Sequence, residues 1–156
     1  MSELFINIAK AAAVTGHRTL YNDFNRERLE QVFNKLIEGG FDTFLVGMAV
    51  GFDTECFLVL EKIRKSKPIK IIACIPCLNQ DAKFSDKQKI LYRKMIDCAD
   101  EKVILSEKYT PSCMMDRNRY LVDNSSLLIC YKRRETGGTA ATVKYAVKQK
   151  KMILPL

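Results

Sequence analysis

Short apolar runs alternate with longer amphipathic stretches along the whole chain, and this alternation constrains the fold more than any other feature of the sequence. The apolar runs span three to seven residues, which is the length of a buried strand rather than of a buried helix. They predict strands at residues 11–15, 43–46, 69–75, 102–105, 126–130 and 152–154.

The stretches between these runs have the helical period of about 3.6 residues. The clearest one stops at Gly39 and Gly40, and its apolar stripe consists of Leu29, Val32, Phe33, Leu36 and Ile37. Further helices are predicted at about 54–65, 85–99, 112–123 and 139–150. Six strands and five helices in alternation predict an α/β fold. We expect a single Rossmann-like, doubly wound domain over residues 1–156, with a mostly parallel sheet of about six strands and helices on both faces.

This architecture predicts where a ligand binds. In an open parallel sheet the ligand lies at the carboxyl ends of the strands, where the loops that follow them gather. The loops to consider are therefore residues 16–25, 47–53, 76–84, 106–111 and 131–138.

Composition narrows the class of protein. The formal net charge is +8, but residues 132–156 carry seven basic side chains and one acidic one, so most of the excess lies in that segment. Part of this charge is typical of a solvated last helix. No apolar run approaches the roughly 20 residues of a membrane helix, and residues 1–10 do not resemble a signal peptide. We expect a cytoplasmic protein without a membrane segment.

The six cysteines lie mostly inside apolar patterns, where a reduced cysteine behaves as a small hydrophobe. Cys74 and Cys77 have C-x-x-C spacing, but no second cysteine pair or histidine pair completes a zinc site. We therefore expect structural cysteines, no metal site and no required cofactor.

Four segments near the predicted strand ends carry ligand-binding chemistry. The first is TGHR, Thr15 to Arg18, which supplies a hydroxyl, a glycine, the one histidine of the chain and a guanidinium. Such donors suit a phosphate or a carboxylate, although a tight strand exit with a solvated arginine is the alternative. No nucleophile or carboxylate is suitably spaced to make His17 a proton shuttle, so we interpret it as a wall or hydrogen-bonding group of the site.

The second segment is GMAVGFD, Gly47 to Asp53, in which two glycines stand four residues apart between a strand and a helix. Backbone amides and a helix N-terminus would face the ligand in this turn, which also contains Met48 and Gly51. Two interpretations of Asp53 remain open: it caps the helix, or it accepts hydrogen bonds from a ribose or an amine of the ligand.

The third segment is RRETGGTAAT, Arg133 to Thr142, which opens the last helix. Gly137 and Gly138 let the backbone turn toward a phosphate, and the helix dipole favours an anion at this point. Thr139 offers a hydroxyl and is expected to be the N-cap of the helix.

The fourth segment is CMMDRNRYLVDNS, residues 113–125, on a predicted helix. Arg117 and Arg119 are separated by about 200° on such a helix, so they cannot both face one site. We favour Arg117, with its neighbour Asn118, as ligand contacts. The other arginine is expected to point to solvent or to pair with an acid such as Asp116 or Asp123.

Taken in order, these segments resemble the SLOG superfamily, the Rossmann-like group that unites the DNA-processing protein DprA with the LOG phosphoribohydrolases. The closest resemblance is to the YpsA-like family of the DUF1273 type. It spans nearly the whole chain and rests on TGHR at 15–18, GMAVGFD at 47–53, ACIPCLNQ at 73–80, the segment 106–129 and GGTAATVKYA at 137–146.

The resemblance implies a nucleotide or a nucleotide-derived ligand whose phosphate lies near the glycine loop that precedes the last helix. Combined with the four segments, it gives a candidate ligand-binding set of Thr15, Gly16, His17, Arg18, Gly47, Met48, Gly51, Asp53, Arg117, Asn118, Gly137, Gly138, Thr139 and Thr142. Pro76, Gln80 and Phe84 are candidates for a further wall of the site.

An enzyme is a second hypothesis. LOG enzymes cleave the N-glycosidic bond of a nucleoside monophosphate with a glutamate placed three residues after the threonine of their glycine loop, together with an arginine that Arg117 matches. Thr142 stands at the glutamate position here, and a hydroxyl cannot replace a carboxylate in that role. A hydrolase would need Asp53 or Glu135 as a substitute. We therefore favour a sensor or regulatory module over an enzyme.

Nucleic-acid binding is a third hypothesis, since DprA-like proteins bind single-stranded DNA and share the RNR element at 117–119. The contacts would come from Lys132, Arg133 and Arg134. Sites for single strands usually add aromatic platforms, and Tyr131 and Tyr145 are the aromatic residues near this basic region. Family likeness also suggests a homodimer formed through helices.

Overall fold

The computed structural model describes residues 4–156, in which six strands and five α-helices alternate after a short 3₁₀ helix at Ile8–Lys10. The strands are β1 (Ala11–Gly16), β2 (Thr43–Val46), β3 (Lys70–Ile75), β4 (Glu101–Ile104), β5 (Leu127–Tyr131) and β6 (Met152–Pro155). The helices are α1 (Arg26–Glu38), α2 (Phe52–Arg64), α3 (Asp86–Cys98), α4 (Cys113–Asp123) and α5 (Gly138–Lys148).

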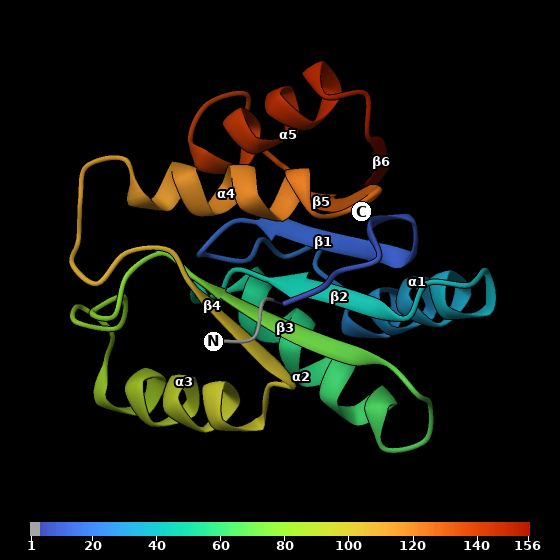
Figure 1. Cartoon of the computed structure of the whole chain (residues 1–156), viewed down its shortest axis with the longest axis horizontal. Coiled ribbons are helices and arrows are strands. Elements are labelled where there is room, and N and C mark those ends of the chain that lie inside the picture. Colours follow the sequence, from blue (N-terminus) through green and yellow to red (C-terminus); the bar gives the residue numbers. More distant parts are fainter. Residues whose placement is uncertain (1–3) are drawn as a thin grey trace.

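All six strands form one parallel sheet in the order β4-β3-β2-β1-β5-β6 (Figure 1). Strands β2, β3 and β4 are added outward on one side of β1. The chain then returns through α4 and places β5 and β6 on the other side of β1. The strand order therefore reverses between β1 and β5, and the predicted doubly wound α/β fold is confirmed.

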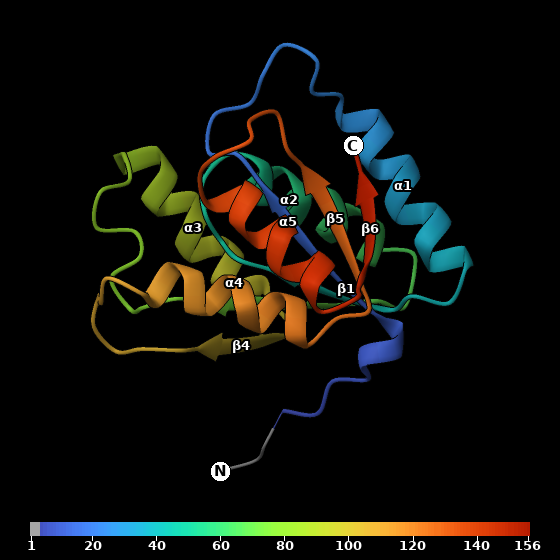
Figure 2. The same cartoon turned by 90° about the horizontal axis from the view of Figure 1, so that it is seen from above.

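Helices cover both faces of the sheet. Helices α1, α2 and α3 pack on one face, and α4 and α5 pack on the other, where Figure 2 shows them in front of the strands. Side chains of β1 alternate between the two layers: Ala12 and Val14 join the core with α1 to α3, while Ala11 and Ala13 join the core with α4 and α5. Burial on both faces explains why β1 is an unbroken apolar run.

Glycine rather than a side-chain cap begins helices α2 and α5. Gly51 and Gly137 hold the N-cap positions of α2 and α5, with φ of 85° and 97°. Glycine adopts this backbone conformation without steric cost, and each helix starts earlier than predicted as a result. Asp53 and Thr139 lie inside the first turns, so the prediction of Thr139 as N-cap and the capping interpretation of Asp53 are wrong.

The packing of α1 against the sheet gives a stability prediction. Phe33 is fully buried and meets Phe44 edge-to-face with a centroid separation of 5.4 Å, whereas Phe5 is 84% exposed. Phe33→Ala should lower the free energy of unfolding by about 3–5 kcal/mol through lost burial and an unfilled cavity. The same substitution at Phe5 should change it by less than about 0.5 kcal/mol. Urea unfolding of both variants measures the difference, and equal losses would contradict the described core.

Candidate functional site

A cavity of about 420 Å³ opens at the carboxyl end of β1, between the loop that follows β1, helix α4 and the start of α5. Its wall is formed by Val14, Thr15, Gly16, His17, Arg18, Thr19, Tyr21, Ala49, Asp53, Met114, Arg117, Asn118, Leu121, Arg134, Gly138 and Thr139. The wall contains three arginines, Arg18, Arg117 and Arg134, but only one carboxylate, that of Asp53, among the described residues. The cavity therefore lies where an open α/β sheet is expected to bind its ligand, and its charge favours an anion.

Close packing joins the loop after β1 to the start of α2. The backbone N–H of Phe52 donates to the carbonyl of His17 at 3.0 Å. A Cβ on Gly16 would come within 2.4 Å of the Phe52 ring, and a Cβ on Gly51 would come within 2.2 Å of the carbonyl oxygen of Arg18. The two glycines are thus required by the protein's own packing, which fixes the loop that carries His17 and Arg18.

Arg117 is the buried cation of the site. It projects from α4, is 5% exposed, and donates from Nη1 to the carbonyl of Gly47 and from Nε to the Oδ1 of Asn118 at 2.9 Å. A Cβ on Gly47 would lie 2.8 Å from the guanidinium, so this glycine makes room for the arginine. Arg119 is exposed and lies over the ring of Tyr145, as expected from the helical spacing.

Asp53 is the acid of the site. It is 7% exposed, and its Oδ2 accepts a hydrogen bond from the backbone N–H of Ala49 at 3.1 Å. Burial raises its pKa from the ordinary 3.8 to about 6, against the opposing attraction of Arg117, the Ala49 hydrogen bond and Arg18. A carboxyl group with this pKa can both hold and release a proton near neutral pH.

The start of α5 forms the remaining wall. Gly138 and Thr139 line the cavity, and a Cβ added to Gly138 would meet nothing within 4 Å. The packing of the protein therefore does not require a glycine at position 138. Thr142, one turn further, donates its hydroxyl to the carbonyl of Gly138 at 2.8 Å and does not reach the cavity wall.

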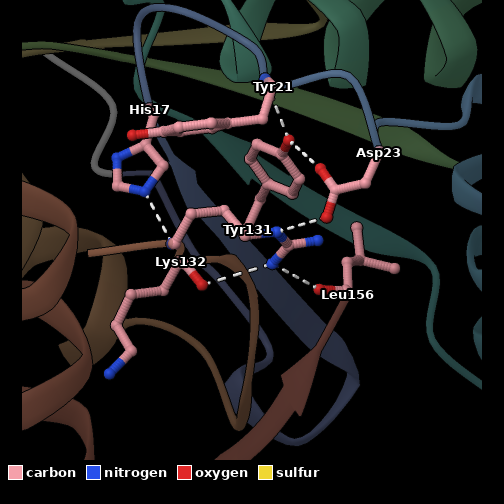
Figure 3. Close-up of polar contacts among 7 residues, drawn as sticks. His17, Tyr21, Asp23, Tyr131, Lys132 and Leu156 are labelled. Atoms are coloured by element: carbon pink, nitrogen blue, oxygen red, sulfur yellow. Dashed lines mark hydrogen bonds and ion pairs between the residues drawn. The ribbon is translucent and has the colours of Figure 1, made fainter. Parts of the chain in front are cut away.

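His17 is held by the loop between β5 and α5. Its ring is 3% exposed, and Nε2 accepts a hydrogen bond from the backbone N–H of Arg133 at 2.8 Å (Figure 3). The Nη2 of Arg134 lies 3.3 Å from Nδ1. Burial, followed by the charges of Arg134 and Arg133, lowers the pKa of His17 from its ordinary 6.5. The imidazole is therefore neutral at physiological pH.

The three basic residues at 132–134 do not form a single patch. Lys132 pairs with Glu135 at 3.1 Å, and Arg134 enters the cavity wall. Arg133 donates to the Oδ2 of Asp23 at 2.7 Å. The side chain of Glu135 is 88% exposed and lies outside the cavity wall, so Asp53 is the acid that the structure places in the site.

A second cavity, of about 570 Å³, adjoins the first and shares Arg18, Ala49 and Met114 with it. Its wall contains two of the three predicted wall residues, Gln80 and Phe84, while Pro76 is absent from it. The remaining lining residues are Val50, Cys77, Asn79, Ala82, Lys83, Gln88 and Tyr109. The two cavities together form a groove that runs from α5 to the loop before α3.

The structure thus brings together nine of the predicted ligand-binding residues in the first cavity: Thr15, Gly16, His17, Arg18, Asp53, Arg117, Asn118, Gly138 and Thr139. Met48 and Gly51 line a smaller cavity that shares Val50, Phe84 and Gln88 with the second one. Gly47, Gly137 and Thr142 do not line the first cavity. Sequence reasoning did not single out Thr19, Tyr21, Ala49 and Met114. The first three belong to loops that the predicted sheet already indicated, but nothing in their residue types points to a ligand.

Within residues 4–156, no cluster of three or more histidine, cysteine, aspartate or glutamate side chains is arranged to hold a metal ion. The same part of the chain has no helix of sufficient length and hydropathy to span a membrane.

The buried carboxyl group gives a pH prediction. The raised pKa of Asp53 means that protonation favours folding, so this contribution is complete below pH 3.8 and is lost as the pH rises through about 6. Asp53→Asn cannot ionise. Its free energy of unfolding, relative to that of the native protein, should rise by about 2–3 kcal/mol between pH 4 and pH 8. Urea unfolding across this range measures the change.

Asp97→Asn is the matched control, because Asp97 is exposed on α3. Because an exposed carboxylate keeps its hydration on folding, we expect the difference between this variant and the native protein to change much less over the same pH range. An equally small change for Asp53→Asn would show that the Asp53 carboxylate is not destabilised by burial.

Comparison with known proteins supports the same fold. The structure of DNA processing protein A of Streptococcus pneumoniae is similar over 94% of this chain, with a TM-score of 0.71 and 19% sequence identity. The present chain spans 50% of that protein's chain. DNA processing protein A of Helicobacter pylori, whose single-stranded DNA binding mode has been described structurally, is similar over 96% of this chain and 66% of its own, with 17% identity and a TM-score of 0.67.

Sequence comparison adds the family. The uncharacterized SPbeta prophage-derived protein YoqJ of Bacillus subtilis is 29% identical over 118 residues, which cover 67% of this chain and 69% of that protein. The YpsA family model, described as the YspA SLOG family, matches residues 21–153. The chain therefore belongs to the YpsA family of SLOG proteins.

Proposed function

We propose that this protein binds a nucleotide or a nucleotide-derived ligand at the carboxyl ends of its strands and acts as a sensor or regulatory module. The observation that carries this proposal is the convergence of Arg18, Arg117 and Arg134 on one cavity beside the start of α5. Asp53 is the single carboxylate among the residues that line the cavity in the described part of the chain. This excess of positive charge favours a phosphate-bearing ligand.

The phosphate fits best at the first turn of α5. Backbone N–H groups at a helix start lack partners within the helix, and the helix dipole adds partial positive charge there. Gly138 leaves its side of the cavity open, and the buried hydroxyl of Thr139 stands beside it. Asp53, which lines the same cavity from the first turn of α2, is a suitable acceptor for ribose hydroxyls.

The second cavity suits the uncharged part of such a ligand. Phe84 and Tyr109 offer aromatic surface, and the Asn79 and Gln88 amides offer hydrogen bonds. Aromatic stacking and amide hydrogen bonds are the usual means by which proteins hold a nucleobase. Because the two cavities share three residues, one ligand can reach from the arginines into this space.

A nucleoside-phosphate N-glycosidase is the second candidate, and the observation that favours it is the buried Asp53 with its pKa near 6. In such a reaction water replaces the base at the ribose, and free base and ribose phosphate leave. Thr142 is bound to the helix backbone, so Asp53 would be the group that activates water or assists the departure of the base.

Single-stranded DNA is a further anionic candidate, because the Helicobacter pylori neighbour has a described binding mode for it. The likeness to that protein, at 17% sequence identity, is a likeness of fold alone. In the present structure Arg133, the middle residue of the basic segment, is occupied by Asp23 and by two backbone carbonyls. Arg133 is therefore less available to a strand, and we favour a small nucleotide.

Gly138 supplies the binding test. Gly138→Asp should leave the melting temperature equal or slightly higher, because a carboxylate in the first turn of a helix stabilises it. The same carboxylate should repel a phosphate, and we expect the thermal shift produced by nucleotides to disappear. Gly138→Ala, which adds volume without charge, should retain part of the shift. The measurement is a melting-temperature screen with mononucleotides, dinucleotides and an oligothymidylate.

Persistence of a full nucleotide shift in Gly138→Asp would contradict a phosphate at this helix start. A shift with the oligothymidylate and with none of the small nucleotides would instead favour the DNA hypothesis.

The catalytic candidate is tested by product analysis. We expect each nucleotide that shifts the melting temperature to be recovered intact after prolonged incubation, as for a sensor. Release of free base, detected by chromatography and lost in Asp53→Asn, would replace the sensor by the N-glycosidase. Base release that survives in Asp53→Asn would exclude this aspartate as the catalytic acid.

A further inference from the structure

Two hydrogen-bond donors face the ring of His17. The backbone N–H of Arg133 donates to Nε2 at 2.8 Å, and the Nη2 of Arg134 lies 3.3 Å from Nδ1. A neutral imidazole has one acceptor nitrogen, because its other nitrogen carries the proton. A backbone N–H is always a donor, so Nε2 is the acceptor. The ring proton of His17 therefore lies on Nδ1.

This assignment places two donors side by side. The Nδ1–H of His17 and the guanidinium of Arg134 cannot hydrogen-bond to each other, although 3.3 Å separates their nitrogens. Both residues line the first cavity. We propose that His17, held as the Nδ1–H tautomer, forms with Arg134 a donor pair that binds one oxygen of an anionic group such as a phosphate.

The surroundings of the ring agree with a neutral donor. The groups that face it are Tyr21 from its own loop, Tyr131 from β5, and Arg133 and Arg134 from the loop before α5. Within residues 4–156 no carboxylate contacts the ring to favour its charged form. Burial and the two arginines lower the pKa of His17, which keeps a single proton on the ring.

Arg133 acts as a positioning residue for this donor pair. Its guanidinium donates to Asp23 at 2.7 Å and to the carbonyl of Leu156 at 2.8 Å, and it lies 4.2 Å from the centroid of the Tyr131 ring. These contacts fix the backbone at position 133, whose N–H selects the tautomer of His17.

Asp23 completes the arrangement, because it uses both carboxylate oxygens. Its Oδ1 accepts from the hydroxyl of Tyr131 at 2.8 Å, and its Oδ2 accepts from Arg133. The hydroxyl of Tyr131 in turn accepts the backbone N–H of Tyr21 at 3.1 Å. The loop that carries His17 is thereby tied to the loop that carries Arg134.

The inference rests on the proposed function for the identity of the ligand, but its test does not. The chain has one histidine, so ¹⁵N NMR of the imidazole reports on His17 alone. At pH 7.5 we expect the proton on Nδ1 and not on Nε2. Titration with inorganic phosphate should move the Nδ1–H resonance in a saturable way.

Asp23→Asn tests the positioning role. Tyr131 and Arg133 donate to different oxygens of Asp23, and an asparagine has an oxygen at only one of these two positions, so one of the hydrogen bonds is lost and the share of the Nε2–H tautomer should rise. The affinity for inorganic phosphate should fall by about two- to tenfold, as expected for a weakened hydrogen bond. Asp123→Asn is the matched control, since Asp123 accepts from the hydroxyl of Tyr145 at 2.7 Å away from the cavity. It should change neither quantity.

Substitution of the histidine separates the two ring positions. The amide nitrogen of asparagine reproduces the position of Nδ1, and that of glutamine reproduces the position of Nε2. His17→Asn should therefore keep phosphate affinity within about threefold, whereas His17→Gln should lose about tenfold.

An Nε2–H tautomer or an imidazolium at pH 7.5 would overturn the inference. An Nδ1–H resonance that neither phosphate nor a bound nucleotide moves would overturn the donor pair, even if the nucleotide binds elsewhere in the groove. Conversely, a phosphate response without binding of any nucleotide would support the donor pair and contradict the proposed function.

Discussion

The parallel pairing of β1 with β5 is the constraint on which the site depends. Five residue pairs set its register, and the last of them places Gly16 beside Tyr131. The loops that follow β1 and β5 therefore leave the sheet side by side. As a result, the ring of His17 contacts the backbone N–H of Arg133. A shift of this register by one residue would reverse the faces of β5 and separate the histidine from its partner. The same pairing joins the two halves of the doubly wound sheet.

The alternation of apolar runs and amphipathic stretches was enough to predict the sheet, the number of elements and the edge that holds the cavity. Local rules were less successful at the helix starts. Asp53 and Thr139 are residue types that cap helices, but Gly51 and Gly137 take the cap positions, because the chain enters both helices through a turn with positive φ. Strands β4 and β5 also begin and end one residue away from the predicted bounds, since pairing with neighbours decides where a strand ends.

Within the site, the sequence predicted features that depend on local geometry, such as which arginine of α4 is buried. It did not predict features that depend on contacts between distant segments. The helical angle between Arg117 and Arg119 predicted that one arginine faces inward, and Arg117 is buried. For residues 132–134, however, sequence offers three similar cations in a row. The structure gives them different partners: Lys132 pairs with Glu135, Arg133 donates to Asp23 and to the carbonyl of Leu156, and Arg134 lies beside His17. The partners of Arg133 and Arg134 are distant in sequence, so local pattern does not reveal them. His17 was predicted as a wall residue and lines the cavity, but its tautomer could not be predicted, because the group that selects it is a backbone N–H far along the chain.

The glycines around the cavity differ in what holds them in place. Gly16, Gly47 and Gly51 are each confined by a neighbouring group of the protein, whereas the space in front of Gly138 is empty of protein atoms. A side chain at any of the first three positions would have to displace a neighbouring group, whereas one at position 138 would displace none. The size and charge of the residue at the start of α5 can therefore be changed without repacking the scaffold, which makes position 138 the point where the cavity can be redesigned independently of the fold.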